Sequence, residues 1–315
     1  MSYKPPLFLF NGHLETIFPS LIRRVTVPPY VRERISTPDD DFLDLDWIRT
    51  GSKKLLIISH GLEGSSDRAY VKGLAKAALG NGFDVLAWNF RGCGGEINRQ
   101  LRFYHSGATD DLHTVVKHAL NNGTYNEINL AGFSLGGNLT LKYLGERSHN
   151  SPLKRAVVFS VPLDLHTSCA KISQPSNWIY ANRFLRSLKQ KVVLKSARFP
   201  ELETRYLPTI RTIQAFDDVY TAPLHGYRDA ADYYTQNSSI HFVGAIKIPT
   251  LIINAMNDPF LSRACFPVDL LRDHAHVRLE TPSRGGHVGF AQFTPAGLYW
   301  SEARAIEFLT ADAVD

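Results

Sequence analysis

One serine of the sequence lies in a pattern that is typical of a catalytic nucleophile. Residues 132–136 read Gly-Phe-Ser-Leu-Gly, which matches G-x-S-x-G with Ser134 at its centre. Where this pattern carries chemistry, the serine occupies a strained turn between a strand and a helix, and the glycines leave room for both elements. An apolar run precedes Ser134 and a helical pattern follows it, so we expect such a turn here. A glycine-rich turn without chemistry is the alternative.

A serine hydroxyl needs a base to remove its proton, and that base needs an acid to orient it. In this kind of site the three residues follow one another in the order Ser, Asp or Glu, His. Asp258 follows the apolar run 250–254, and His287 follows the run 277–280. If both runs are strands of one parallel sheet, their carboxyl ends bring the two side chains to the edge where Ser134 lies. We therefore predict that His287 is the base and Asp258 the acid.

Other residues compete for these two roles. Asp164 also follows an apolar run and is the alternative acid, while Asp258 precedes a proline and is equally a residue that starts turns. His274 and His276 are alternative bases, but both precede the last predicted strand, where an ordinary surface position is the simpler interpretation. Two glycines precede His287, and they allow its loop to turn the imidazole back over the sheet edge.

A second loop is expected to complete the site. Residues 60–64 read His-Gly-Leu-Glu-Gly and directly follow the apolar run 55–58. Acyl transfer from a serine passes through an oxyanion, which backbone N–H groups must stabilise. We predict that one N–H comes from Leu135, directly after the nucleophile, and the other from Leu62. His60 itself is predicted to be structural, and a plain glycine-rich turn is again the alternative.

The sequence lacks the motifs of metal and dinucleotide sites. It has no HExxH, EF-hand or P-loop pattern, and residues 92–95 do not form GxGxxG. We therefore expect neither a metal nor a cofactor. Cys93, Cys169 and Cys265 form no CxxC pair, so a disulfide framework is not expected, and Cys93 is predicted to pack rather than react. Arg91, in the loop after the run 83–90, is predicted to form a structural salt bridge.

Strands and helices alternate along most of the chain. Near-continuous apolar strands separated by helices indicate an α/β fold with a parallel sheet that is covered on both faces. An antiparallel hairpin is predicted ahead of this core. The predicted strands are 32–35 and 43–48 in the hairpin, then 55–58, 83–90, 127–133, 156–161, 250–254 and 277–280, and the helices are 67–79, 110–120, 135–144 and 299–309.

The alternation stops between residues 164 and 245. Apolar residues from Trp178 to Val192 recur at spacings of three and four, which predicts an amphipathic helix, and a further helix is predicted over 227–234. We interpret 164–245 as a helical lid inserted into a core made of 1–163 and 246–315, with an N-terminal arm over about the first 30 residues. Four aromatic or apolar residues of this lid are candidates to line an acyl site or to form its own core: Trp178, Ile179, Tyr180 and Phe184.

Composition and charge exclude several classes of protein. Of the 315 residues, 44% are hydrophobic and 21% charged, which is ordinary for a globular protein and excludes a disordered or fibrous one. No apolar run approaches the roughly 18 residues that span a membrane, and the N-terminal apolar stretch is short for a signal peptide, so a cytoplasmic protein is expected.

The net charge of +5 is unevenly distributed. Nine basic and two acidic residues lie between positions 171 and 211, a local charge of +7. This segment is either a solvated helix face or a surface that attracts anionic lipid-like substrates or an anionic membrane; nucleic acid is not an expected partner.

Taken together, the motifs resemble those of the α/β-hydrolase superfamily and, more narrowly, of the YheT-like hydrolases, which include abhydrolase-domain phospholipases and yeast medium-chain ester enzymes. Residues 11–17 (NGHLETI) are similar to the N-terminal segment of that branch, with Glu15 where Gln is more usual. Residues 60–64, 89–92 and 132–138 are similar to its oxyanion, post-strand and nucleophile segments. The resemblance implies a catalytic triad at Ser134, Asp258 and His287.

Three functions remain open from the sequence. The first is a serine hydrolase that cleaves short- to medium-chain or lipid esters through an acyl-enzyme. The second is an acyltransferase with an alcohol acceptor, which shares that intermediate. The third is a binding module that keeps the fold without its chemistry. The substrate-binding residues and the oligomeric state are not indicated by any motif.

Overall fold

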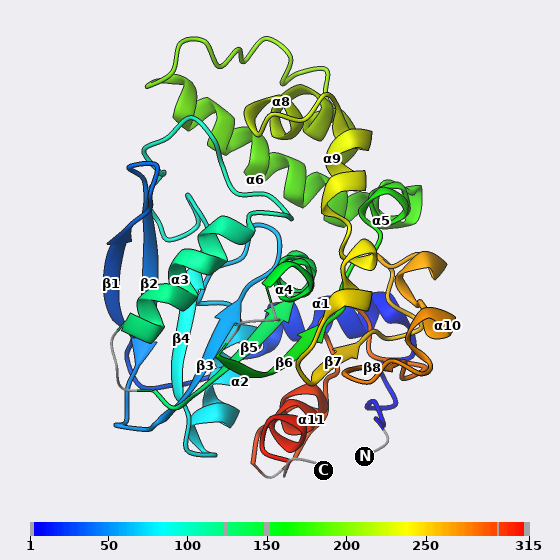
Figure 1. Cartoon of the computed structure of the whole chain (residues 1–315). Helices are drawn as coiled ribbons and strands as arrows, with labels where there is room; N and C mark the ends of the chain where they lie inside the picture. The colour runs from blue at the N-terminus through cyan, green and yellow to red at the C-terminus, as the bar shows by residue number, and fades with distance from the viewer. Residues whose placement is uncertain (1–2, 122–124, 148–151, 295, 312–315) are drawn as a thin grey trace.

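The computed structural model describes residues 3–121, 125–147, 152–294 and 296–311. Its centre is an eight-stranded sheet in the order β1-β2-β4-β3-β5-β6-β7-β8 (Figure 1). The predicted hairpin is confirmed, because β1 and β2 pair antiparallel; β2 also pairs antiparallel with β4, and the strands from β4 to β8 are all parallel. The strands are β1 (Val31–Ser36), β2 (Phe42–Ile48), β3 (Lys54–Ser59), β4 (Asp84–Asn89), β5 (Glu127–Phe133), β6 (Leu153–Phe159), β7 (Thr250–Ile253) and β8 (Val277–Glu280).

Helices cover both faces of the sheet, as the apolar strands predict. On one face, α3 and α4 pack through residues such as Leu112 and Leu139. On the other face, α2 and α11 pack through residues such as Leu74 and Ile306. A short helix, α10, lies between β7 and β8. The bounds of these helices are α2 (Ala69–Leu79), α3 (Thr109–Asn121), α4 (Leu135–Arg147), α10 (Val268–Leu271) and α11 (Trp300–Leu309).

A group of helices connects β6 to β7 and lies over one end of the sheet (Figure 1). This segment, 164–245, is called the cap below. It contains no strand and has an apolar cluster of its own, which includes Leu185, Ile213 and Tyr233. Its helices are α5 (Leu165–Ile172), α6 (Trp178–Ser196), α7 (Ile213–Phe216), α8 (Ala222–Leu224) and α9 (Ala230–Asn237), with a π-helical turn over Asp217–Thr221 and single 3₁₀ turns over Pro175–Asn177, Ser239–His241 and Val243–Ala245.

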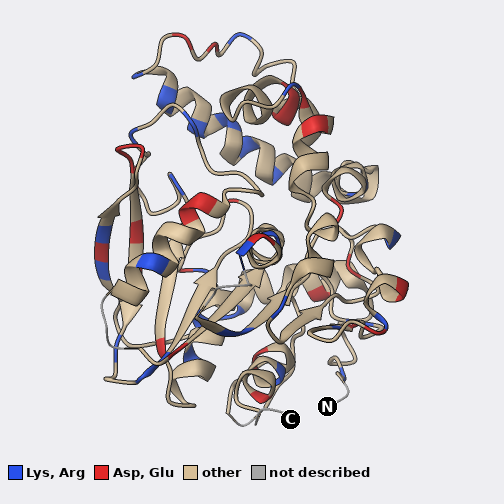
Figure 2. Cartoon of the chain, in the orientation of Figure 1, with Lys and Arg blue, Asp and Glu red and all other residues tan. Residues whose placement is uncertain are grey.

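In the longest cap helix, α6, one residue of the predicted apolar face is not buried. Ala181, Leu185 and Val192 are buried as predicted, but Trp178 is 66% exposed. The spacing of apolar residues identifies a helix face, but it does not show how far the neighbouring elements extend over that face. Figure 2 shows Lys and Arg spaced along α6, which contains no acidic residue.

The N-terminal segment contains a helix, α1 (Gly12–Ile22), that packs beside the loops after β7 and β8. Glu15 on this helix is completely buried. Within the described part of the chain, no helix has the length and apolar character needed to cross a membrane.

Candidate active site

Ser134 occupies a strained turn between β5 and α4. Its backbone φ is +53°, in the left-handed region that side chains rarely adopt, and its N–H donates to the carbonyl of Phe159 on β6 over 2.8 Å. A Cβ on Gly132 would lie 2.5 Å from the carbonyl oxygen of Gly136, and one on Gly136 would collide with the carbonyl of His60. Both glycines of the motif are therefore required by the close approach of the strand, the helix and the loop after β3.

Asp258 and His287 meet Ser134 at the carboxyl edge of the sheet. The Oγ of Ser134 lies 2.9 Å from Nε2 of His287, and Nδ1 of His287 lies 2.8 Å and 3.1 Å from the two carboxylate oxygens of Asp258. The Asp258 side chain is fully buried, and the backbone N–H of Phe260 also donates to it. The two glycines before His287 have φ values of +148° and +60°. Residues with a side chain rarely adopt such values, so this loop conformation requires glycine at both positions.

The competing residues lie in other roles. Asp164 accepts a hydrogen bond from the N–H of Thr167 over 2.8 Å and thereby caps the first turn of α5. His274 accepts hydrogen bonds through Nδ1 from the N–H group of His276, directly before β8, and from that of Val277, the first residue of β8. Asp164 therefore stabilises a helix end and His274 a local turn, and neither is hydrogen-bonded to Ser134 or His287 among the described residues.

Helix α1 supports both loops that carry Asp258 and His287, a contact that the sequence analysis did not anticipate. Glu15 Oε2 accepts hydrogen bonds from Asn257 Nδ2 over 2.6 Å and from the N–H of Gly285 over 3.0 Å. Thr16 Oγ1 accepts a hydrogen bond from the N–H of His287 itself over 2.9 Å. In the sequence, this contact is signalled only by residues 11–17, which resemble the N-terminal segment of the YheT-like branch. That resemblance did not indicate what the segment does.

In the loop at 60–64, most backbone N–H groups donate hydrogen bonds to other described residues, but that of Leu62 does not. The N–H groups of Gly61 and Glu63 donate to the hydroxyls of Tyr70 and Tyr104, and that of Gly64 donates to the Gly61 carbonyl. No described residue accepts a hydrogen bond from the N–H of Leu62. The N–H of Leu135 belongs to the first turn of α4, where N–H groups have no partner within the helix. Both residues line the cavity that contains Ser134.

His60 is structural, as predicted. It is 1% exposed, its Nε2 accepts a hydrogen bond from the N–H of Phe90, and its Nδ1 donates to the Gly61 carbonyl over 2.8 Å. Burial lowers the pKa of this imidazole to about 3, so the ring stays neutral. Its role is therefore to hold the loop against β4.

Glu63 joins the same loop to the cap. Its carboxylate accepts hydrogen bonds from Lys191 Nζ and from the Tyr104 hydroxyl, each over 2.7 Å, and a further one from Ser187. Lys191 and Ser187 both belong to α6. Lys191 Nζ also lies 3.0 Å from the sulfur of Cys93, whose pKa is raised by burial. Cys93 is therefore a packed thiol in a structural cluster, which agrees with its predicted role.

Arg91 forms the predicted structural salt bridge. Its guanidinium is 1% exposed and pairs with Asp39, Asp41 and Asp111 at 2.7–2.8 Å. This ionic cluster ties the hairpin turn between β1 and β2 to helix α3.

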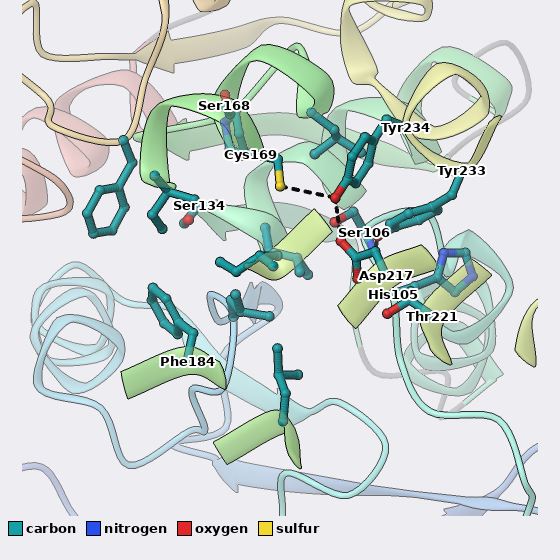
Figure 3. A pocket seen from close by; sticks show the side chains of 18 of the residues that line it. His105, Ser106, Ser134, Ser168, Cys169, Phe184, Asp217, Thr221, Tyr233 and Tyr234 are labelled. Atoms are coloured by element: carbon teal, nitrogen blue, oxygen red, sulfur yellow. Dashed lines mark hydrogen bonds between the residues drawn. The ribbon is translucent and has the colours of Figure 1, made fainter. Parts of the chain in front are cut away.

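A cavity of about 130 Å³ opens beside Ser134, between the sheet edge and the cap (Figure 3). Of the four cap residues that were candidates to line it, only Phe184 does. Trp178 and Ile179 are 66% and 63% exposed, and Tyr180 stacks edge-on against Phe260. The other apolar lining residues are Leu62, Leu135, Pro162, Leu165, Ile172, Leu188, Ile213, Phe260 and Leu261.

The family of the chain follows from comparison with known proteins. Residues 54–292 match the model of the α/β-hydrolase fold family, and the chain belongs to that family. Among curated relatives, the Escherichia coli (strain K12) protein named "Putative esterase YheT" is 36% identical over 95% of this chain and 90% of its own length. Bovine phospholipase ABHD3 is 28% identical over 92% of this chain and 74% of its own.

A solved structure gives the same fold. The esterase Pf2001 of Pyrococcus furiosus superposes with a TM-score of 0.61 at 20% identity, over 91% of this chain and 94% of the esterase. At this identity the likeness concerns the fold alone. The predicted α/β-hydrolase fold and the resemblance to the YheT branch are therefore confirmed.

Proposed function

We propose that the protein hydrolyses carboxylic esters, with Ser134 as the nucleophile of an acyl-enzyme mechanism. The observation that carries this proposal is the continuous hydrogen-bonded chain from Ser134 through His287 to the buried Asp258, beside an apolar cavity. The relatives named as esterase and phospholipase support an ester as the substrate class.

Each residue has a distinct task in this mechanism. His287 takes the proton of the Ser134 hydroxyl through Nε2 as the oxygen attacks the ester carbonyl, and Asp258 holds the ring and stabilises the imidazolium. The N–H groups of Leu62 and Leu135 donate to the oxyanion of the tetrahedral intermediate. The alcohol leaves with the proton from His287, and water then attacks the acyl-enzyme by the same route in reverse.

The cavity indicates the size of the acyl group. Its volume of about 130 Å³ is close to that of the engineered cavity of about 150 Å³ that holds a benzene molecule. An acyl chain of about six carbons therefore fills it. We propose short- to medium-chain esters as substrates, with the cap serving as the lid that excludes water from the acyl group.

The test compares Ser134→Ala with the wild-type protein on p-nitrophenyl esters of graded chain length. We expect Ser134→Ala to lose hydrolysis by about a millionfold, as in other serine hydrolases, and to lose labelling by a fluorophosphonate. Ser283→Ala, an exposed serine four residues before His287, is the matched control and should keep both. Hydrolysis that survives in Ser134→Ala would refute the proposal. Product analysis with ethanol present separates the free acid of hydrolysis from the ethyl ester of acyl transfer.

We also propose that the outer face of α6 contacts anionic lipid. Trp178 and Ile179 are exposed there, and Arg183 and Arg186 one to two turns further along are exposed as well. Exposed apolar side chains beside Arg are the combination that binds an anionic interface. Sedimentation with phosphatidylserine liposomes at low and high salt tests this. Binding that does not weaken with salt, or that persists in Arg183→Ser/Arg186→Ser, would contradict it.

A further inference from the structure

One wall of the cavity carries polar side chains that the proposed mechanism does not use. Asp217, Thr221 and Tyr234 line the cavity, together with His105, and Figure 3 shows them on the side away from Ser134. Asp217 is only 8% exposed, and no ion pair joins it to a Lys or Arg of the described part of the chain. A buried carboxylate without a cation is costly unless hydrogen-bond donors surround it.

The donors within the protein do not use the full capacity of this carboxyl group. The Tyr234 hydroxyl donates to Asp217 Oδ2 over 2.6 Å, and the nearby Thr221 side chain also favours the ionised carboxyl group by lowering its pKa. An ionised carboxylate has about four acceptor positions. Burial raises the pKa of Asp217 to about 6, so the group is still mainly ionised at neutral pH. Acceptor capacity therefore remains for a group that enters the cavity.

The backbone at Asp217 is unusual as well. Asp217–Thr221 forms a π-helical turn, in which the N–H of Ala222 donates to the Asp217 carbonyl. Such turns are rare and occur frequently at functional sites. Here the turn places two polar residues, four positions apart, on the cavity wall.

His105 supplies a donor on the same wall. The N–H of Gly107 donates to its Nδ1 over 3.2 Å, and burial holds the pKa of the ring well below its ordinary value. The neutral ring therefore carries its proton on Nε2. Within the described ranges of the chain, no residue accepts a hydrogen bond from this nitrogen.

We propose that this wall is a subsite for a hydroxyl group at the far end of the substrate's acyl chain. The hydroxyl donates to Asp217 and accepts from Nε2 of His105, while the apolar walls contact the chain between the hydroxyl and the ester. The inference rests on the proposed function, because Ser134 defines the ester end of the cavity. An acyl chain that ends in an alkyl group would leave Asp217 and His105 buried without these partners. A site built to hydrogen-bond a substrate hydroxyl strongly rejects an analogue that lacks it.

The experiment measures a preference between two esters of equal size. p-Nitrophenyl 6-hydroxyhexanoate and p-nitrophenyl heptanoate differ only in a terminal hydroxyl in place of a methyl group. We expect kcat/KM to favour the hydroxyl ester at least tenfold, and Asp217→Leu to reverse the preference. Asp218→Asn is the matched control, since Asp218 is exposed and accepts a hydrogen bond from the Ala230 N–H that an Asn oxygen can also accept. It should keep the preference.

A binding measurement separates this inference from the proposed function. The methyl esters of 6-hydroxyhexanoic and heptanoic acid are titrated calorimetrically into Ser134→Ala, with and without Asp217→Leu. A hydroxyl preference in binding without any hydrolysis by the wild type would uphold the subsite and refute the esterase proposal. Hydrolysis with no hydroxyl preference in either measurement would overturn the subsite alone. A stronger preference for the 6-aminohexanoyl ester would also overturn it, because an ammonium group cannot accept from His105.

Discussion

The contact between helix α1 and the two loops that carry Asp258 and His287 gives the sharpest prediction for stability. Glu15 is completely buried and accepts hydrogen bonds from Asn257 and from the Gly285 N–H, while its other oxygen lies 3.1 Å from Nε of Arg284. Removing one partner of a buried charge pair costs about 3–5 kcal/mol. The Arg284 side chain keeps 34% exposure, so water can solvate its charge, and the lower end of that range applies. We expect Glu15→Ala to lower the free energy of unfolding by about 3 kcal/mol.

The same substitution should reduce catalysis, because Asn257 adjoins Asp258 and Gly285 lies two residues before His287. A displacement of about 1 Å at reacting groups costs on the order of a hundredfold in rate, so we expect kcat/KM to fall by about 10- to 100-fold. Glu15→Gln keeps an acceptor oxygen but loses the charge. Glu15→Gln should lower the free energy of unfolding by about 1 kcal/mol and keep kcat/KM within about threefold of the wild-type value.

Urea denaturation measures the first effect, with the slope of the transition checked for constancy, and ester hydrolysis measures the second. Glu201→Ala, an exposed glutamate of the cap, is the control for the loss of one carboxylate. If Glu15→Ala shifts the free energy of unfolding by less than about 1 kcal/mol and keeps the wild-type kcat/KM, then α1 does not support the loops that carry Asp258 and His287.

Three further predictions concern the ionic clusters. Arg91→Met leaves Asp41 buried without its cation and leaves Asp111 only the more distant Arg102, and thermal unfolding should show a loss of stability of about 3–5 kcal/mol; an unchanged midpoint would contradict the structural role. Burial alone would raise the pKa of Asp41, but the hydrogen bonds it accepts and the charge of Arg91 lower it, so its stabilisation is present above about pH 4 and is lost as the pH falls below that value. Urea midpoints between pH 3 and 6 should fall toward acid, and a flat profile would count against this. Lys191→Met removes the ion pair between α6 and Glu63 and leaves only the Ser187 hydrogen bond there, so limited proteolysis should cut the cap faster and kcat/KM should fall several-fold; wild-type cleavage rates would exclude this ion pair as the anchor of the cap.

The sequence by itself determined the class of fold and the position of the strained turn between strand and helix that holds Ser134. Each of these features depends on a short stretch of consecutive residues. Apolar runs of four to eight residues identify the strands, because a strand buried on both faces needs apolar residues at every position. The G-x-S-x-G spacing identifies the turn at Ser134, because only glycine allows the strand, helix and β3 loop to approach so closely. The order of Asp258 and His287 after the last two strands follows from the same local pattern.

Only the tertiary structure decided which distant residues meet. Glu15 contacts Gly285 across 270 positions, and no local pattern encodes that contact. The helical spacing in α6 predicted a buried face, yet the packing of the cap left Trp178 exposed and turned Phe184 into the cavity. Asp217 carried no recognisable motif, and it became a candidate binding residue only because a π-helical turn places it in the cavity. Periodicity within an element depends on neighbours along the chain, whereas these contacts depend on how whole elements pack against one another.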